Sequence, residues 1–211
     1  MLVSASILSD TLIPSSIVKE LNKSKVDFIH LDIMDGKFVD NKTWTYGEIK
    51  KIIKDTNKSL DVHLMVEKPS KYISDYALLN TEYLTVHYEI TKNLEQIIDE
   101  IKSYGLKPGV SIKPSTDVDV LIPFLNKIEL VLIMSVEPGK SGQGFIEDTP
   151  NKILKLKNII DKENLKTIIS IDGGINNETG LLCKNAGCDM LVSASYIHKD
   201  IINNVKILKE I

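Results

Sequence analysis

The sequence predicts an α/β fold, a closed (β/α)8 barrel of the TIM-barrel type. Eight short runs rich in β-branched and large apolar residues recur along the chain, and segments with helical periodicity separate them. A strand followed by a helix, repeated eight times, requires parallel strands joined by crossover connections. Eight such units favour a closed barrel over an open doubly wound sheet.

The predicted strands follow one another along the whole chain, with starts 23 to 37 residues apart. They span residues 2–8, 26–33, 60–66, 83–87, 107–112, 130–136, 167–171 and 190–193. The turn after the first strand contains no glycine, whereas a doubly wound sheet that binds a dinucleotide typically has a glycine-rich turn there. This third observation also favours the barrel.

The helical segments are recognised by their apolar spacing and by the residues at their ends. The clearest segment places apolar residues at i, i+3, i+4 and i+7, namely Leu94, Ile97, Ile98 and Ile101. Pro69 stands where a helix is expected to begin. Gly105 and Gly187 stand where helices are expected to end, each just before a predicted strand.

The composition is that of a globular protein. The 211 residues include 43% hydrophobic and 26% charged residues, and no linker or low-complexity stretch divides them. We therefore expect a single domain spanning residues 1–211. No apolar run reaches the roughly 18 residues of a membrane span. The first residues lack the features of a signal peptide, so we expect a cytoplasmic protein without a membrane partner.

The charge pattern limits the partners. All 26 basic residues are lysine, and 29 acidic residues give a formal net charge of -3. No basic stripe would follow a nucleic-acid backbone, so we expect no nucleic-acid partner. Because arginine is absent, a phosphorylated ligand would have to be bound by backbone N–H groups, hydroxyls or a lysine.

Polar side chains collect where three predicted strands end. Side chains two positions apart on a strand point the same way, so His30 and Asp32 share a face, as His63 does on the next strand. Asp172 directly follows the seventh predicted strand. In a (β/α)8 barrel these ends meet at one mouth, and mixed nitrogen and oxygen ligands suit Zn, Fe(II), Mn or Co. Each residue alone would more often just cap a strand, but the four together favour a divalent-metal site.

Further residues at strand ends are candidates for ligand contact. Met34, Met65 and Met134 lie in or near the ends of three strands. Methionine is usually an adaptable core residue, and beside a metal site it would form a soft apolar floor under a ligand. His87 ends the fourth strand and either reaches the mouth or has a structural role. We expect His198, in a polar stretch after the last strand, to be exposed.

Three loops offer backbone N–H groups to a phosphate. They are 137–144 after the sixth strand, 172–174 after the seventh and 193–195 after the eighth. Glycine lets the backbone approach a ligand closely, and a short helix that begins at Ser195 would direct N–H groups at an anion. Any one of these loops taken alone is more commonly a tight turn. The loops after strands seven and eight are nevertheless the usual phosphate site of this barrel.

Four segments carry a resemblance to a known family. They are 28–39 (FIHLDIMDGKFV), 61–66 (DVHLMV), 136–139 (VEPG) and 172–175 (DGGI). Together they closely resemble the ribulose-phosphate 3-epimerase family, in a colinear match from Ser4 to about Ile197. The resemblance implies a barrel of the ribulose-phosphate-binding type and an isomerase of the pentose phosphate pathway, and we expect a homo-oligomer.

The resemblance also implies roles for individual residues. His30, Asp32, His63 and Asp172 would bind one divalent metal ion, and Asp32 and Asp172 would double as the two acid/base groups. They would interconvert D-ribulose 5-phosphate and D-xylulose 5-phosphate by proton transfer at C3 through an enediolate. The residues that would contact the phosphorylated ketose are Ser6, Met34, His63, Met65, Met134, Gly139, Lys140, Ser141, Gly142, Gly173, Gly174, Ala194 and Ser195.

The chain departs from the family pattern near the phosphate. Lys140 and Ser141 stand where an aromatic residue and glycine are usual, and Ala194 stands where glycine is usual. An added Cβ at Ser141 or Ala194 would crowd the phosphate, and the charge of Lys140 would offset part of that loss. These departures concern affinity and not the type of reaction.

Two alternatives remain at this point. One is an epimerase for a hexulose 6-phosphate such as allulose 6-phosphate, which would use the same catalytic residues. The other, of a different class, is a phosphosugar-binding barrel that has lost turnover. Retention of both carboxylates and both imidazoles argues against the second alternative.

Overall fold

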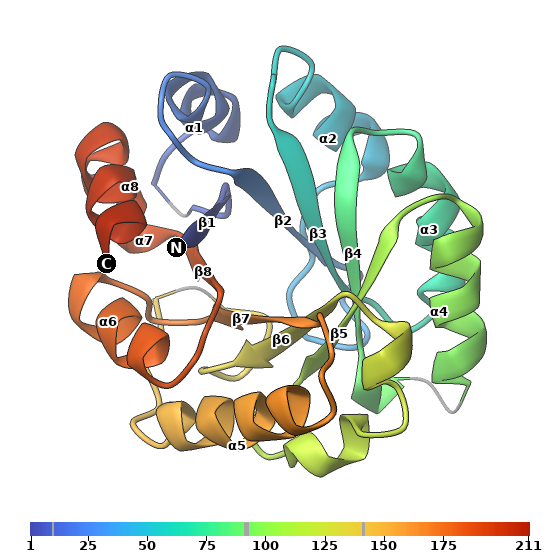
Figure 1. Cartoon of the computed structure of the whole chain (residues 1–211). Coiled ribbons are helices and arrows are strands. Elements are labelled where there is room, and N and C mark those ends of the chain that lie inside the picture. Colours follow the sequence, from blue (N-terminus) through green and yellow to red (C-terminus); the bar gives the residue numbers. More distant parts are fainter. Residues whose placement is uncertain (10, 91–92, 141) are drawn as a thin grey trace.

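The computed structural model describes residues 1–9, 11–90, 93–140 and 142–211, and its strands form one closed parallel barrel (Figure 1). Neighbouring strands pair in chain order, and β8 closes the barrel against β1. The strands are β1 (Leu2–Ser6), β2 (Phe28–Met34), β3 (Ser59–Met65), β4 (Thr81–His87), β5 (Lys107–Ile112), β6 (Leu130–Met134), β7 (Ile168–Asp172) and β8 (Met190–Ser193). The predicted (β/α)8 fold class is confirmed.

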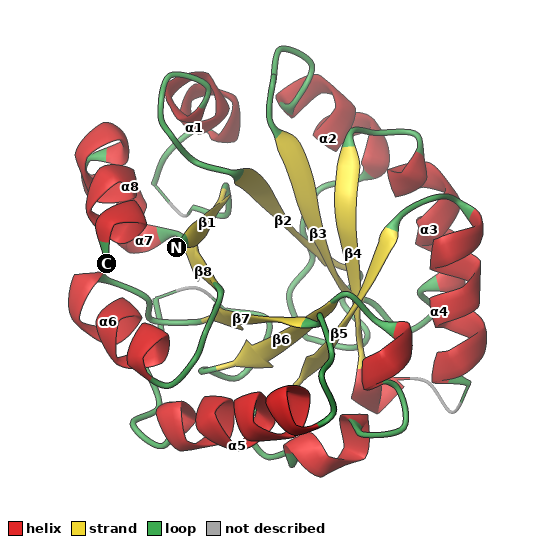
Figure 2. Ribbon diagram, in the orientation of Figure 1, coloured by secondary structure: helices red, strands yellow, loops and turns green. Residues whose placement is uncertain are grey.

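Helices surround the strands in an outer ring, as Figure 2 shows by its red helices outside the yellow barrel. They are α1 (Pro14–Leu21), α2 (Tyr46–Ile52), α3 (Ser70–Ala77), α4 (Leu94–Ser103), α5 (Thr149–Lys162), α6 (Asn177–Asn185), α7 (Ser195–Lys199) and α8 (Ile201–Glu210). Short 3-10 turns are η1 (Tyr88–Ile90), η2 (Val118–Leu121) and η3 (Leu125–Lys127). No helix of the described ranges is both long enough and apolar enough to span a membrane.

Two apolar layers hold the barrel together. The larger one lies between strands and helices, and it includes Leu31, Val62 and Ile98. The smaller one fills the inside of the barrel, where the rings of Phe28 and Tyr83 meet edge to face with centroids 5.5 Å apart. Strands covered on both sides are buried at nearly every residue, which explains why the sequence shows continuous apolar runs rather than simple alternation.

The predicted strand boundaries differ from the observed ones by at most two residues at either end. Two of the predicted ranges, 107–112 and 190–193, coincide with β5 and β8. The sixth run extends to Val136 in the sequence, but β6 ends at Met134. Val136 is still buried, because its side chain packs with the apolar residues inside the barrel. The Ser135 N–H next to it donates to the Asp172 carbonyl.

Candidate active site at the mouth of the barrel

The register of β2 and β3 places the polar residues of the two strands side by side. His30 lies opposite Asp61, Asp32 opposite His63, and Met34 opposite Met65. Alternation along each strand directs these side chains to the inside of the barrel. Asp32 and His63 therefore reach the mouth from neighbouring strands.

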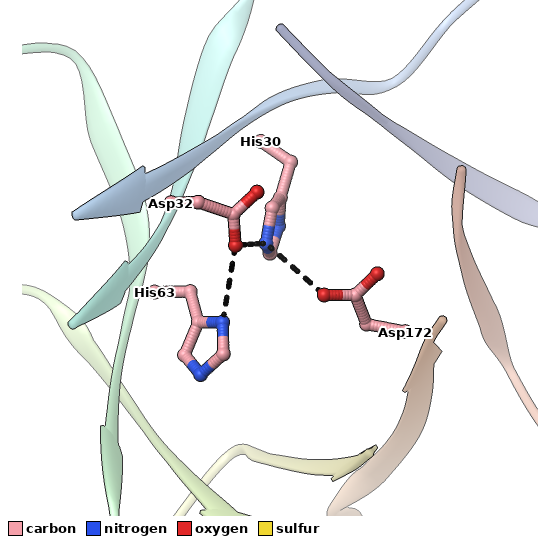
Figure 3. Close-up of side chains that lie close together, drawn as sticks. All are labelled: His30, Asp32, His63 and Asp172. Atoms are coloured by element: carbon pink, nitrogen blue, oxygen red, sulfur yellow. Dashed lines mark hydrogen bonds and ion pairs between the residues drawn. The ribbon is translucent and has the colours of Figure 1, made fainter. Parts of the chain in front are cut away.

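Asp172, the last residue of β7, approaches the same point from across the barrel (Figure 3). Oδ1 of Asp32 lies 3.3 Å from His30 Nε2 and 3.3 Å from His63 Nδ1. Oδ2 of Asp172 lies 3.9 Å from the same His30 Nε2. One potential ligand atom from each of His30, Asp32, His63 and Asp172 lies within 4.8 Å of the others. The four side chains thus form one compact group of nitrogen and oxygen donors.

His30 is oriented by a second carboxylate beneath it. Its Nδ1 lies 2.7 Å from Asp61 Oδ2, which also accepts a hydrogen bond of 2.8 Å from the Ser4 hydroxyl. A proton on Nδ1 leaves the lone pair of Nε2 directed at Asp32 and Asp172. In the described part of the chain, His30 Nε2 is a fully buried atom that makes no hydrogen bond of good geometry, although Asp32 Oδ1 and Asp172 Oδ2 lie within 3.9 Å of it. A buried lone pair of this kind facing two carboxylates fits a divalent cation.

The electrostatics of the group agree with such a cation. Burial raises the pKa of Asp172 to about 6, and the nearby negative charge of Asp32 adds to the effect. Burial also acts to raise the pKa of Asp32, but the charge and hydrogen bonds of His30, with those of His63, outweigh it and hold this pKa well below its usual range. Two carboxylates thus compete for little positive charge in a buried place, a conflict that a bound divalent ion removes.

A cavity of about 620 Å³, including its open side, lies above this group. Asp32 and Asp172 line it, whereas His30 and His63 are completely buried below. The other predicted contact residues that line it are Ser6, Met34, Met65, Met134, Gly139, Lys140, Gly142, Gly173, Gly174, Ala194 and Ser195. Ser141, the remaining predicted contact, lies outside the described residues. The structure therefore gathers eleven of the thirteen predicted contacts around one space, with His63 buried below it.

The loops after β2 and β6 meet at the rim of the cavity. The Asn41 side-chain amide donates to the Gly139 carbonyl at 2.6 Å. A Cβ at Gly139, whose φ is +105°, would lie 2.7 Å from Val39 Cβ, so only glycine fits this contact. Gln143 closes the loop internally by donating to the carbonyls of Glu137 and Lys140. The contacts of Asn41 and Val39 with Gly139 were not predicted, because they join two loops that are far apart in the sequence.

The other two histidines, His198 and His87, are half-buried and completely buried, respectively. The prediction that His198 is exposed is wrong: the ring is half-buried, and Nε2 donates to the Ser6 carbonyl at 2.8 Å. This bond links α7 to the end of β1, which are adjacent only because the barrel closes. His87 is completely buried, with Nε2 2.9 Å from His63 Nε2. It does not line the cavity, and its ring contacts His63 and, with centroids 4.7 Å apart, the Phe38 ring of the loop after β2.

Comparison with known proteins decides the family. A family model described as the ribulose-phosphate 3 epimerase family matches residues 2–198. The chain belongs to this family. It is 42% identical over 195 residues to a ribulose-phosphate 3-epimerase of Methanocaldococcus jannaschii, covering 92% of this chain and 82% of that protein. It is 38% identical over 198 residues to a ribulose-phosphate 3-epimerase of Bacillus subtilis, covering 93% of this chain and 91% of that protein.

Solved structures agree with the fold of the family. A 3-hexulose-6-phosphate synthase superposes with a TM-score of 0.68 over 100% of this chain and 99% of that chain, at 15% sequence identity. KGPDC from Streptococcus mutans gives a TM-score of 0.68 at 12% identity, over 99% of this chain and 95% of that chain. At such identities the likeness concerns the barrel alone. The epimerase family uses a divalent metal, and the buried group of His30, Asp32, His63 and Asp172 is able to hold one.

Proposed function

We propose that this chain interconverts D-ribulose 5-phosphate and D-xylulose 5-phosphate by inverting the configuration at C3. The observation that carries the proposal is the buried donor group at the mouth, in a chain that belongs to the epimerase family. Its two carboxylates come from β2 and β7, on different sides of the barrel. Inversion next to a ketone requires a proton acceptor on one face of the carbon and a proton donor on the other.

Asp32 and Asp172 are the residues that we assign to these two roles. One carboxylate takes the C3 proton, and the electron pair left on carbon is delocalised into the C2 carbonyl. The other carboxyl group delivers its proton to the opposite face of C3, so the two residues exchange protonation states in each turnover. A divalent ion held by His30, Asp32, His63 and Asp172 would supply Lewis-acid stabilisation of the negative charge that develops on the substrate oxygens.

The Ser6 hydroxyl orients the first carboxylate. Ser6 Oγ donates to Asp32 Oδ2 at 2.9 Å and accepts a hydrogen bond from the Leu8 N–H at 3.2 Å. These bonds hold one oxygen of Asp32 while the other, Oδ1, faces the two imidazoles. A fixed carboxylate keeps the acceptor atom in line with the reacting carbon, which lowers the entropy cost of the step.

The rest of the cavity suits a phosphorylated sugar. Met34, Met65 and Met134 give its lower wall an apolar, adaptable surface. Gly173, Gly174, Ala194 and Ser195 line its other side, and we assign their backbone N–H groups to the phosphate. Lys140 lines the same cavity and supplies a positive charge that the backbone lacks.

Other features predicted from the sequence remain predictions. These are the cytoplasmic location, the homo-oligomeric state, the absence of a nucleic-acid partner and the single domain. The two relatives compared above are named for the pentulose phosphate, so the hexulose 6-phosphate alternative is not favoured. The alternative of a barrel without turnover is separated from ours by the experiment that follows.

The experiment combines metal analysis of the purified chain with a measurement of hydrogen exchange at C3. After its metal content is determined, the zinc-loaded or iron-loaded chain is incubated with D-ribulose 5-phosphate in D2O, and products are followed by NMR. We expect D-xylulose 5-phosphate that carries one solvent deuteron at C3, because the returning proton comes from a carboxyl group that has exchanged with solvent. Epimerised product without deuterium at C3 would contradict the two-carboxylate step. Binding of the substrate without any exchange or product would favour the barrel without turnover.

A further inference from the structure

A chain of hydrogen bonds runs outward from His63, away from the cavity, and it is buried at the two histidines and exposed at its far end, Glu89. His63 Nε2 lies 2.9 Å from His87 Nε2, and His87 Nδ1 lies 3.1 Å from Glu89 Oε2. His87 ends β4 and Glu89 lies in η1, directly after it. Both imidazoles are completely buried. The donor group at the mouth is therefore connected to a carboxylate that takes no part in it.

The far end of this chain is fixed by donors of the next loop. Glu89 Oε1 accepts hydrogen bonds from the Lys113 N–H at 2.7 Å and from the Thr116 hydroxyl at 2.5 Å. The backbone N–H of Lys113 can only donate, so the atom that faces it must be an acceptor. Glu89 thus presents one oxygen to Lys113 and Thr116 and the other to His87.

Only one proton fits between two ring nitrogens 2.9 Å apart, so the two histidines have linked tautomers. If His87 carries its proton on Nδ1 and donates it to Glu89, His63 must donate from Nε2, and His63 Nδ1 keeps a lone pair. If the arrangement is reversed, the lone pair of His87 Nδ1 faces the Glu89 carboxylate, and His63 Nδ1 carries a proton. A neutral imidazole carries one N–H, so these are the two arrangements open to a pair of neutral rings.

The orientation of His63 decides which arrangement the mouth needs. Its Nδ1 lies 3.3 Å from Asp32 Oδ1, inside the donor group, whereas its Nε2 points to His87. His63 can therefore ligate a metal only through Nδ1, and only when that atom carries no proton. Asp32 itself favours the wrong tautomer, because it would accept a hydrogen bond from a protonated Nδ1. The carboxylate at the other end of the chain must counteract it.

We propose that Glu89, acting through His87, is a positioning residue that sets the tautomer of His63 and keeps its Nδ1 lone pair directed at the metal. Neither Glu89 nor His87 touches the substrate or the metal. The inference rests on the metal site of the proposed function and adds two residues that support it from outside. Partners of this kind fix both the ring orientation and the tautomer of a ligating histidine.

Replacement of Glu89 by glutamine reverses the bias. The amide oxygen must face the Lys113 N–H, because that group needs an acceptor. The amide nitrogen then faces His87 Nδ1 and donates to it, so His87 donates from Nε2 and His63 carries its proton on Nδ1. To bind a metal, the variant must rotate the introduced side-chain amide by half a turn, which turns its oxygen toward His87 Nδ1. The amide NH2 group then faces the Lys113 N–H, and both of these groups are donors. Glu89→Gln therefore opposes metal binding while changing almost no volume.

The experiment measures zinc affinity and histidine tautomers, neither of which requires turnover. Zinc affinity is obtained by competition with a chromophoric chelator for the wild type, for Glu89→Gln and for a matched control, Glu82→Gln. Glu82 lies in β4, but at the opposite end of the strand from His87, where it pairs with Lys107. We expect Glu89→Gln to bind zinc 10- to 100-fold more weakly, the usual effect of losing such a partner, and Glu82→Gln to bind it unchanged.

Long-range 1H–15N NMR of histidine-labelled protein reads the tautomers directly, since the chain has only four histidines. In the zinc-loaded wild type we expect the proton of His87 on Nδ1 and that of His63 on Nε2. In zinc-free Glu89→Gln we expect both to be reversed. A wild-type His87 protonated on Nε2 would overturn the inference even if the variant failed to fold, and so would zinc affinity within twofold of wild type in a folded variant.

The outcomes separate this inference from the proposed function. Failure of the wild type to bind zinc, iron, manganese or cobalt would overturn both, because it removes the metal site. Tight binding by both wild type and Glu89→Gln, together with C3 exchange, would leave the epimerase standing and overturn the role of Glu89 alone.

Discussion

The two ends of the barrel interior are filled by residues of opposite character, apolar at one end and polar at the other. At the N-terminal end, Phe28, Tyr83, Leu130 and Met190 begin or nearly begin their strands and pack as an apolar layer. At the C-terminal end, β2, β3 and β7 bring imidazoles and carboxylates together around an open cavity. The closed end stabilises the fold without bearing any chemistry, and the open end bears the chemistry at a cost in buried charge.

This contrast predicts where each kind of substitution should act. Loss of apolar volume at the closed end should change stability and leave catalysis per folded molecule intact. Loss of a donor at the open end should change catalysis strongly, because those side chains are held by one another rather than by the core. Substitutions at each end, and removal of the metal, test this separation.

The largest effect is expected at the two carboxylates of the open end. Asp32→Asn and Asp172→Asn should each lower kcat/KM for D-ribulose 5-phosphate by at least about 10²–10⁴-fold, since each removes one acid/base group. The measurement is a coupled assay, with circular dichroism to confirm folding. Asp55→Asn, which alters a highly exposed carboxylate after α2, is the matched control and should keep full activity. Either site variant within tenfold of the wild type would remove the two-carboxylate assignment.

The next largest effect is expected in the apolar layer of the closed end. Leu130→Ala removes a side chain that is 1% exposed, and it should lower the free energy of unfolding by about 2–5 kcal/mol. Activity per folded molecule should stay within twofold of wild type at low temperature. Leu154→Ala, on the exposed side of α5, should cost no more than about 0.5 kcal/mol. Chemical denaturation measures both, and a strong loss of activity in folded Leu130→Ala would show that the two ends are not separable.

Metal removal should have its strongest local effect at the open end. At a free metal concentration of one hundred times its dissociation constant, binding stabilises the native state by about 2.7 kcal/mol, which chelation would remove. We expect a lower melting temperature, loss of activity, and faster hydrogen exchange near the ends of β2, β3 and β7. Exchange at the starts of β4 and β6 should change little. An unchanged melting temperature after verified removal of the metal would speak against a resident ion in the donor group.

The smallest effects are expected from one lysine at each end. Lys140→Met at the mouth should raise KM about fivefold, equivalent to about 1 kcal/mol, without changing stability. Lys209→Met at the closed end breaks an ion pair with both oxygens of Asp27, at 2.8 and 2.7 Å, and should lower stability by up to about 1 kcal/mol. KM should not change in the second variant. The reverse pattern would contradict the division between the two ends.

Much of the fold and part of the candidate site follow from local sequence. The strand runs are recognisable because strands buried on both faces need continuous apolar residues, and β5 and β8 even begin and end where predicted. The meeting of His30, Asp32 and His63 follows from period-two alternation on adjacent strands. Asp172 joins them because the barrel closes, which the count of eight units already indicates.

The interactions that sequence analysis missed depend on side-chain orientation across long separations. His198 is half-buried where it donates to the Ser6 carbonyl. The sequence does not reveal this contact, because the two residues lie 192 positions apart in the chain. The link between His63 and His87 depends on how two rings are turned on neighbouring strands, which no residue pattern specifies. A histidine that ends a strand, followed two residues later by a glutamate, was the available signal, and it does not reveal the pairing.

The contact between Gly139 and Val39 has a consequence for how the rim behaves. Because the Asn41 side chain also donates a hydrogen bond to the Gly139 carbonyl, the loops after β2 and β6 are mechanically coupled. A shift of either loop displaces the other, so a side chain at position 139 would push the two loops apart. Substitutions in one loop are thereby constrained by the other loop, which lies nearly one hundred positions away along the chain.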